Sequence, residues 1–213
     1  MGREKKSKVN KKTFYIRNPV RKKILNLRKK VKFNVNKKKI NILIVGGSQG
    51  AAIFDKIIPE SLNLLPYQIK KKLFIYHQCS KKNFDIVKKN YIKNKIKCSC
   101  RSFFNNLPDI MFKSKFIISR SGASTLSEII TLGKASILIP YKLAKNNHQE
   151  ENAKWLERNK ASVIIKEDKL TKENLKNKIL SFIKNKNILK KMSKNSFSLG
   201  DEDSLLKLSK IIY

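Results

Sequence analysis

The sequence predicts an α/β fold with a doubly wound parallel sheet. From Ile40 onward, short apolar runs of strand length alternate with amphipathic stretches of helical length, which is the pattern of βαβ units. Two runs end in a glycine turn that opens a helix, INILIVGGSQGAA at Ile40–Ala52 and IISRSGASTLSEIITLG at Ile117–Gly133. A helix N-terminus offers unpaired N–H groups and the positive end of a dipole, so each junction suits an anion. Two such junctions in one small domain indicate a nucleotide-diphosphate ligand.

The individual elements follow from the spacing of apolar residues. Strands are expected at 40–45, 73–76, 96–100, 116–119, 136–139 and 162–165, where apolar runs of strand length occur. Helices are expected at about 52–65, 81–91, 108–113, 125–132, 148–159 and 172–185, with one or two more in the tail 187–213. Ligands of such sheets bind beyond the carboxyl ends of the strands, where both glycine junctions lie.

Residues 1–39 differ from the rest of the chain. They hold 17 Lys or Arg against one acid, Glu4, and they show little periodicity apart from one short helix expected around Lys22–Lys29, after Pro19. We therefore divide the chain into a basic lead-in with a linker segment, 1–39, and a ligand-binding domain with C-terminal helices, 40–213.

The net charge of +35 leaves three interpretations open. The charge can reflect compositional drift toward Lys, Asn and Ile, attraction to an anionic membrane surface, or binding to nucleic acid. Nucleic acid is the least favoured, because no stacked-aromatic or base-reading motif accompanies the charge.

Other classes of protein are not indicated. The apolar runs are far shorter than the ~20 residues of a membrane-spanning helix, and no signal-peptide pattern opens the chain. The cysteines Cys79, Cys98 and Cys100 are odd in number, so a disulfide framework is not expected. Cys98 and Cys100 share one face of an expected strand and are interpreted as core residues rather than metal ligands. Neither a metal nor a cofactor is expected, and a reducing cytosolic compartment fits.

Two polar motifs follow the glycine turns. Ser48 in the first turn can add a hydroxyl to a phosphate oxygen, although the same turn also serves as a tight strand–helix connection. In the second, Thr125 and Glu128 have capping-box spacing, so Glu128 either caps the helix or accepts hydrogen bonds from a ribose diol.

Other segments could contribute to the same edge. The polar run 146–153, which contains His148 and Gln149, opens a helix and suits sugar hydroxyls or forms an ordinary polar helix start. Phe103 and Phe104 can line a pocket for an aromatic base or pack in the core. His77-Gln78, at the end of an expected strand, would not attract notice by itself.

In order along the chain, these motifs resemble the MurG family. They are NPVR at 18–21, GGSQGA at 46–51, HQ at 77–78, FFNNLPDIM at 103–111, SRSGASTLSE at 119–128 and HQEENA at 148–153. The family comprises UDP-N-acetylglucosamine:N-acetylmuramyl-(pentapeptide) pyrophosphoryl-undecaprenol N-acetylglucosaminyltransferases, inverting enzymes that make lipid II from lipid I in peptidoglycan synthesis. The resemblance covers roughly residues 13–185. It implies a Rossmann-like domain, the C-terminal, donor-binding half of a GT-B glycosyltransferase.

The resemblance also implies roles for the glycine junctions. The turn with Gly47, Ser48 and Gln49 is expected to hold the diphosphate of UDP-N-acetylglucosamine. Ala123 and Thr125 are expected at the start of the helix that faces the same diphosphate.

For the rest of the donor, the resemblance places uracil at the backbone of Phe104, with Phe103 and Leu107 lining that pocket. It also implies that Glu128 binds ribose and that Arg21 closes the nucleotide site from the linker.

The resemblance also places His148 and Gln149 at the N-acetylglucosamine hydroxyls. The chain departs from the family pattern at Arg17 and Ser80, where glycine is usual.

No catalytic residue is assigned, because the family's acceptor loop, proposed histidine base and membrane-facing patch belong to a first domain that we do not find. The chain alone is therefore expected to be inactive in transfer. The expected partners are the lipid-linked muramyl-pentapeptide acceptor, through that missing N-terminal domain, and an anionic membrane surface. The expected location is the cytoplasmic, inner face of the cell membrane. Two alternatives remain: a subunit of a split GT-B transferase with a membrane-bound partner, and a degenerate basic binding protein without transferase activity.

Overall fold

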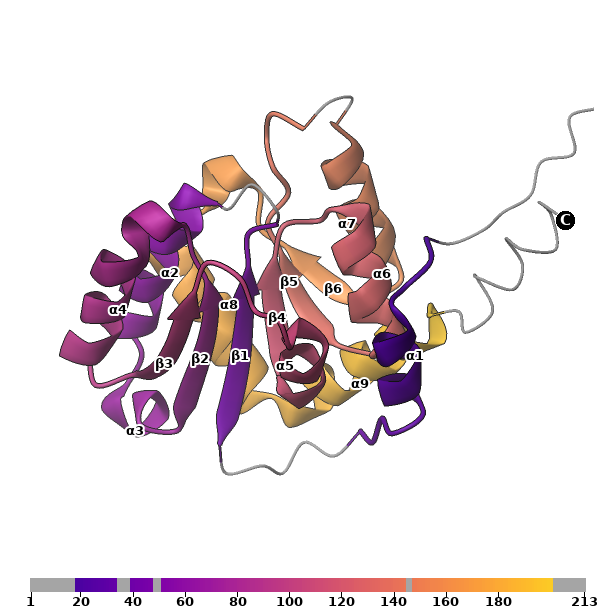
Figure 1. The fold of residues 1–213 in the computed structure, drawn as a ribbon, viewed down its shortest axis with the longest axis horizontal. Coiled ribbons are helices and arrows are strands. Elements are labelled where there is room, and N and C mark those ends of the chain that lie inside the picture. The colour runs from indigo at the N-terminus through magenta and orange to yellow at the C-terminus, as the bar shows by residue number, and fades with distance from the viewer. Residues whose placement is uncertain (1–17, 34–38, 48–50, 145–146, 201–213) are drawn as a thin grey trace, which may run out of the picture.

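The described residues of the computed structural model, 18–33, 39–47, 51–144 and 147–200, form one parallel sheet with helices on both faces (Figure 1). The sheet has six strands in the order β3-β2-β1-β4-β5-β6, and every neighbouring pair is parallel. The strands are β1 Ile40–Val45, β2 Leu73–Gln78, β3 Lys97–Arg101, β4 Phe116–Ser119, β5 Ala135–Leu138 and β6 Ser162–Ile164. This is the strand order of a doubly wound dinucleotide-binding sheet, so the predicted fold class is confirmed.

All six predicted strands are present. β1 and β4 have the predicted bounds, and the other four differ by one or two residues at an end. The agreement follows from burial, because both faces of a parallel sheet are covered and the strands become continuous apolar runs.

The predicted helices are also present, with shifted ends. They are α1 Lys22–Arg28, α2 Ala52–Asn63, α4 Phe84–Lys93, α5 Leu107–Lys113, α6 Ala123–Thr131, α7 His148–Arg158, α8 Lys172–Lys184 and α9 Lys186–Ser198. Helix α3, Tyr67–Lys70, and the 3₁₀ turns η1, Lys81–Asn83, and η3, Glu167–Lys169, were not predicted. Each of the three spans at most one turn, too short to show periodicity.

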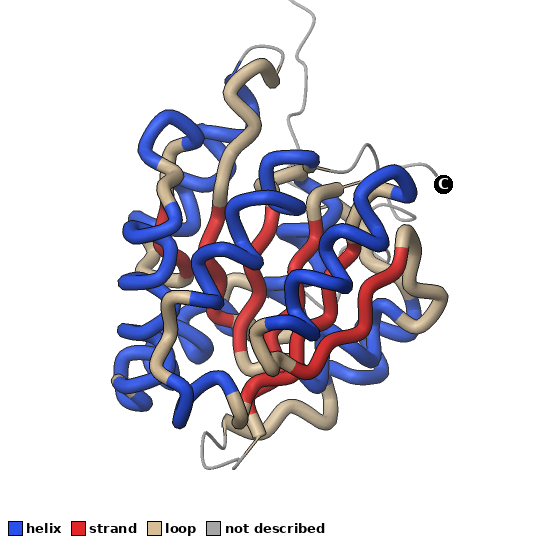
Figure 2. The backbone as a smooth tube through the Cα atoms, turned by 90° about the vertical axis from the view of Figure 1, so that its left-hand side faces the viewer, coloured by secondary structure: helices blue, strands red, loops and turns tan. Residues whose placement is uncertain are grey.

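Helices lie on both faces of the sheet (Figure 2). A hydrophobic core fills the space between the sheet and the helices on each face. Successive side chains of β1 alternate between the two cores, with Ile42 and Ile44 in one core and Leu43 and Val45 in the other. Helices α2, α4, α8 and α9 cover the first face, while α1, α5, α6 and α7 cover the second. Cys100 is buried and Cys98 partly buried in the first core, in agreement with the core interpretation of these residues.

Helix α1 packs against α5 and α6. Ile24 is fully buried in the second core, and Arg28 donates to the backbone oxygens of Thr131, at 2.9 Å, and Phe197, at 3.2 Å. The Arg28 guanidinium also lies 3.7 Å from the centre of the Phe197 ring, a cation–π contact. The two ends of the described chain are thus in contact through Arg28 and Phe197. Within the described residues, no helix combines the length and apolarity needed to cross a membrane.

Candidate functional site

A cavity of about 920 Å³ opens at the carboxyl edge of the sheet, where the strand order reverses. The reversal lies between β1 and β4, the two strands that lead into the glycine turns. Ligands of doubly wound sheets bind at this switch point. The lining includes five predicted site residues, Gly47, Ala123, Thr125, His148 and Gln149.

The turn after β1 has the predicted glycine conformation. Gly47 has a φ of 87°, in the left-handed region that side chains disfavour, and both Gly46 and Gly47 line the cavity. An added Cβ at Gly47 would meet nothing within 4 Å, so conformation rather than space requires glycine there. The predicted phosphate ligands Ser48 and Gln49 lie outside the described residues.

The turn after β4 presents an open helix N-terminus. The N-cap of α6 is Gly122, and no side chain caps the helix. Helix α6 begins at Ala123, two residues before the predicted start, so the capping-box interpretation of Thr125 and Glu128 is wrong. Glu128 lies in the second turn of α6, because Gly122 takes the N-cap position. The first N–H groups of α6 therefore face the cavity without an internal acceptor from a capping side chain.

Gln149 ties two loops together at the cavity wall. Its side-chain oxygen accepts hydrogen bonds from the backbone N–H groups of Ser121, at 3.3 Å, and Tyr141, at 3.1 Å. The Ser121 hydroxyl donates back to the Gln149 carbonyl at 2.7 Å, and Asn152 donates to the Ser121 carbonyl at 3.1 Å. The Gln149 side-chain oxygen thus already accepts two hydrogen bonds from the protein. A ligand hydroxyl would therefore be contacted by the Nε2 group of Gln149.

Arg120 and Glu167 line the cavity and were not predicted. The Arg120 guanidinium binds both carboxylate oxygens of Glu167, at 3.0 and 3.1 Å, and donates to the carbonyls of Ile139 and Pro140. It also lies 5.2 Å from the centre of the Tyr141 ring. Burial acts to raise the pKa of Glu167, but the hydrogen bond from Arg120 helps hold that pKa below its usual value.

Glu128 and Arg21 form a bidentate ion pair. Arg21 Nε lies 2.6 Å from Glu128 Oε1, and Arg21 Nη2 lies 2.8 Å from Glu128 Oε2. Neither residue is part of the cavity lining. The structure therefore brings the predicted ribose ligand and the predicted linker arginine together, but outside the lining of this cavity.

Phe103 and Phe104 belong to a separate hollow of about 400 Å³ after β3, where Tyr76 and Asn106 also contribute to the lining. Phe103 is 65% exposed, whereas Phe104 is 3% exposed and its ring lies 6.2 Å from that of Tyr76. Leu107 is partly buried and is not part of this lining.

A buried polar network connects α2, β2 and α4. His77 Nδ1 lies 2.9 Å from the Tyr91 hydroxyl, and His77 Nε2 lies 3.4 Å from Asp55 Oδ1. Asp55 Oδ2 accepts from the Ser80 hydroxyl and backbone N–H and from the Asn83 amide, which fixes the loop after β2. Sequence reasoning missed this network, because the three elements meet only once the strands pair.

We expect this network to make the fold acid-sensitive. Burial lowers the pKa of His77 from its usual 6.5, although Asp55 acts to raise it. Because the unfolded chain then binds more protons, stability falls as pH drops below 6.5, by at most about 1.4 kcal/mol per pH unit. Urea denaturation between pH 7 and 5 should show this slope in the wild type and in His148→Gln. His77→Gln should flatten it, and an unchanged slope would contradict the assignment.

Comparison with known proteins gives one family. Residues 41–208 match the family described as Glycosyltransferase family 28 C-terminal domain. Among curated relatives, UDP-N-acetylglucosamine–N-acetylmuramyl-(pentapeptide) pyrophosphoryl-undecaprenol N-acetylglucosamine transferase of Buchnera aphidicola subsp. Schizaphis graminum is 39% identical over 198 residues, 92% of this chain and 54% of the relative. The equally named protein of Wolbachia sp. subsp. Drosophila simulans is 34% identical over 173 residues, 81% of this chain and 50% of the relative. The chain thus spans about half the length of these relatives.

Solved structures agree in fold. MurG of Acinetobacter baumannii matches with a TM-score of 0.75 and 26% identity, over 84% of this chain and 53% of that one. The lipopolysaccharide glycosyltransferase WaaG matches with a TM-score of 0.58 and 15% identity, over 91% of this chain and 52% of that one. The second likeness bears on fold alone.

Proposed function

This chain belongs to the glycosyltransferase family 28 C-terminal domain family, and we propose that it is the donor-binding half of an N-acetylglucosaminyltransferase that makes lipid II in peptidoglycan synthesis. The donor would be UDP-N-acetylglucosamine, which the similar proteins carry in their names. The main observation in support is the cavity at the strand-order reversal, where a glycine turn and the uncapped start of α6 lie together.

The proposed chemistry uses backbone groups. When the sugar leaves UDP, negative charge develops on the diphosphate, and the N–H groups and dipole of α6 would stabilise it. Arg120 adds a positive charge to the wall, although Glu167 balances it. Among the described residues, no group of three His, Cys, Asp or Glu could hold a metal ion.

We assign the remaining contacts by position. The exposed Phe103 ring would stack on uracil, with the Phe104 backbone as its hydrogen-bonding edge. His148 and the Nε2 group of Gln149 would contact the sugar hydroxyls from the start of α7. The ribose diol would bind Glu128, whose carboxylate oxygens both accept hydrogen bonds from Arg21.

The acceptor would bind elsewhere. We propose that an N-terminal domain, corresponding to the other half of the relatives' length, supplies the lipid-linked muramyl acceptor site and the catalytic base. The assembled enzyme would act at the inner face of the cell membrane, where the basic surface of this chain favours anionic lipids. Cell-wall biogenesis, cell shape and division would then depend on it.

Calorimetry with the full 213-residue chain tests donor binding. UDP-N-acetylglucosamine should bind more tightly than UDP, and ADP should bind far more weakly than UDP. The reason is that the proposed pocket recognises the sugar hydroxyls and uracil separately. Equal affinity for ADP and UDP would exclude the uracil assignment at Phe104.

Glu128→Gln should weaken UDP binding by ~1–3 kcal/mol, the range for a hydrogen bond to a charged group. Its melting temperature should change little, because the Arg21 side chain is 47% exposed and the Glu128 side chain 13%, and the glutamine oxygen can still accept one of the two hydrogen bonds from Arg21. Calorimetry and thermal unfolding check the two parts. Glu151→Gln, which alters an exposed acid on α7, is the control. A lower melting temperature with unchanged affinity for UDP would show that Glu128 has a structural role and does not bind the ribose.

A further inference from the structure

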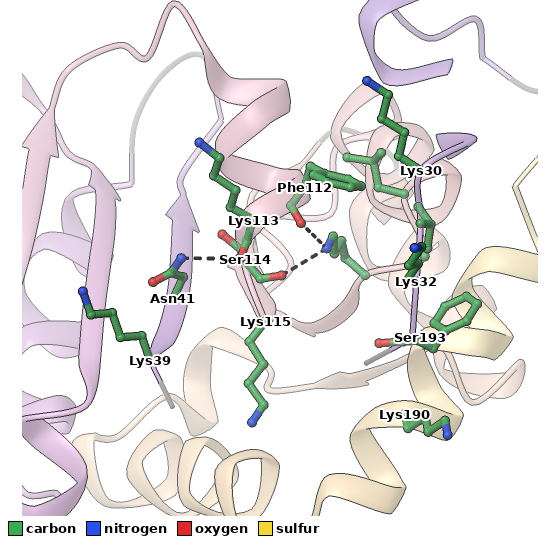
Figure 3. A pocket seen from close by; sticks show the side chains of 15 residues that line it. Lys30, Lys32, Lys39, Asn41, Phe112, Lys113, Ser114, Lys115, Lys190 and Ser193 are labelled. Atoms are coloured by element: carbon green, nitrogen blue, oxygen red, sulfur yellow. Dashed lines mark hydrogen bonds between the residues drawn. The ribbon is translucent and has the colours of Figure 1, made fainter. Parts of the chain in front are cut away.

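A second cavity, of about 360 Å³, lies at the amino edge of the sheet, opposite the donor cavity. Figure 3 shows the side chains that line it. It opens where the chain enters β1, β4 and β5 and where helices α1, α5 and α6 end. We call it the lysine pocket; its lining consists of Lys30, Val31, Lys32, Phe33, Lys39, Asn41, Phe112, Lys113, Ser114, Lys115, Leu132, Gly133, Lys134, Lys190 and Ser193.

The charge of the lysine pocket is one-sided. Seven of its 15 lining residues are lysines and none is Asp or Glu. Helix C-termini attract cations, but each carries only about half a negative charge, so three helix ends account for fewer than two lysines. Lys134 serves this purpose, because its ammonium donates to the carbonyls of Phe112, at 2.6 Å, and Ser114, at 3.1 Å. The other lysines exceed what the helix ends require.

Three lysines of the pocket illustrate this excess positive charge. Lys113 and Lys190 are exposed and have no acidic partner within the described part of the chain. Lys115 is partly buried, and burial together with the positive charge of Lys186 lowers its pKa. Seven lysines with no Asp or Glu in the lining give this surface a positive potential, which a bound anion would reduce.

The wall of the pocket is partly apolar. Val31, Phe33, Phe112 and Leu132 contribute to the lining, and the Phe33 ring is held edge-on against Phe197 at 5.4 Å. The volume falls in the range of small-molecule sites, ~300–1,000 Å³. Bare inorganic ions would leave these apolar groups uncovered.

We propose that the lysine pocket binds a phosphate ester, a phosphate group attached to an apolar body. The phosphate would lie among the lysines and the apolar body against Phe33 and Phe112. This inference does not depend on the donor site, which lies at the other edge of the sheet. Such a ligand could come from a soluble metabolite or from a lipid headgroup, and the two sources share this chemistry.

The test uses the full chain with saturating UDP, so that the donor site does not compete. Phenyl phosphate and inorganic phosphate are titrated while amide NMR signals are followed. Phenyl phosphate should shift the signals of Lys113, Lys115 and Lys134 and bind more tightly than inorganic phosphate. Sedimentation with vesicles of phosphatidylglycerol mixed with phosphatidylcholine, against phosphatidylcholine alone, examines the lipid source.

Two double variants separate the pocket from the general charge of the chain. Lys113→Gln with Lys190→Gln should weaken phenyl phosphate binding about tenfold or more. Lys89→Gln with Lys178→Gln removes the same charge from exposed positions on α4 and α8 and should change the affinity less than about twofold.

The outcomes are distinct. Vesicle binding that the pocket variant weakens and the control variant does not would identify a lipid headgroup as the ligand's source. Phenyl phosphate binding without a vesicle effect would identify a soluble ester. Equal weakening by both variants, or no localised NMR shifts, would overturn the proposal.

Discussion

Ala123→Asp should reduce the affinity for UDP-N-acetylglucosamine by about a hundredfold while leaving the fold as stable as before. Ala123 is the exposed first residue of α6 and lines the donor cavity. A carboxylate there would repel the diphosphate; at ~5 Å and an effective dielectric constant of ~20, a pair of like charges costs ~3 kcal/mol. The same carboxylate interacts favourably with the helix dipole, by ~0.3–1 kcal/mol.

The test is decisive because Ala123→Asp should weaken donor binding while it slightly favours the stability of helix α6. Calorimetry measures the affinity and urea denaturation measures the free energy of unfolding. Ser127→Asp is the matched control, because it adds the same charge to the same helix one turn further on, outside the cavity lining. If Ala123→Asp kept wild-type affinity, the diphosphate would not lie at the start of α6.

Arg120→Met should lower the free energy of unfolding by ~3–5 kcal/mol, the largest stability effect that we expect from one substitution at the site. The Arg120 side chain is only 8% exposed, and its removal leaves the partly buried Glu167 carboxylate without its main partner. Two backbone carbonyls, of Ile139 and Pro140, also lose their donor. Because Arg120 lines the cavity, donor affinity should fall as well.

Urea denaturation checks this expectation, with Arg158→Met as the control. Arg158 is exposed on α7 and lies 3.9 Å from Glu151, so its loss should cost no more than ~0.5 kcal/mol. Adding Glu167→Gln to Arg120→Met should recover part of the stability, because the unpaired charge is then removed. A loss below about 1 kcal/mol for Arg120→Met would mean that water replaces the guanidinium.

The sheet could be predicted from the sequence because each strand is marked by a short run of neighbouring apolar residues. Strands such as β1 and β4 are runs of apolar residues that only a doubly covered sheet can bury. The start of α6 was misplaced by two residues for a local reason too. Thr125 has the side chain of a capping residue, but Gly122 adopts the N-cap conformation earlier.

The polar networks could not be predicted, because their partners are distant in sequence. Arg120 and Glu167 are 47 residues apart and meet only through the pairing of β4, β5 and β6. His77 and Tyr91 are 14 residues apart, and the contact depends on how α4 packs against the sheet. A charged residue directly after a buried strand, such as Arg120, is the signal that could have drawn attention to the first network.

The contact of Arg28 with Phe197 has a practical consequence for the borders of an independently folding unit. Helix α1 precedes the sheet in the chain and α9 follows it, yet Arg28 of α1 donates to the carbonyl of Phe197 in α9 and lies against its ring. In a shortened protein that begins after Arg28, the Phe197 ring and carbonyl of α9 would lose their contact with the guanidinium. In one that ends before Phe197, the buried Arg28 guanidinium would lose one hydrogen-bond acceptor and its cation–π contact. The described segment that contains α1 is therefore packed against the domain, and a shortened protein made for binding studies should keep both α1 and α9.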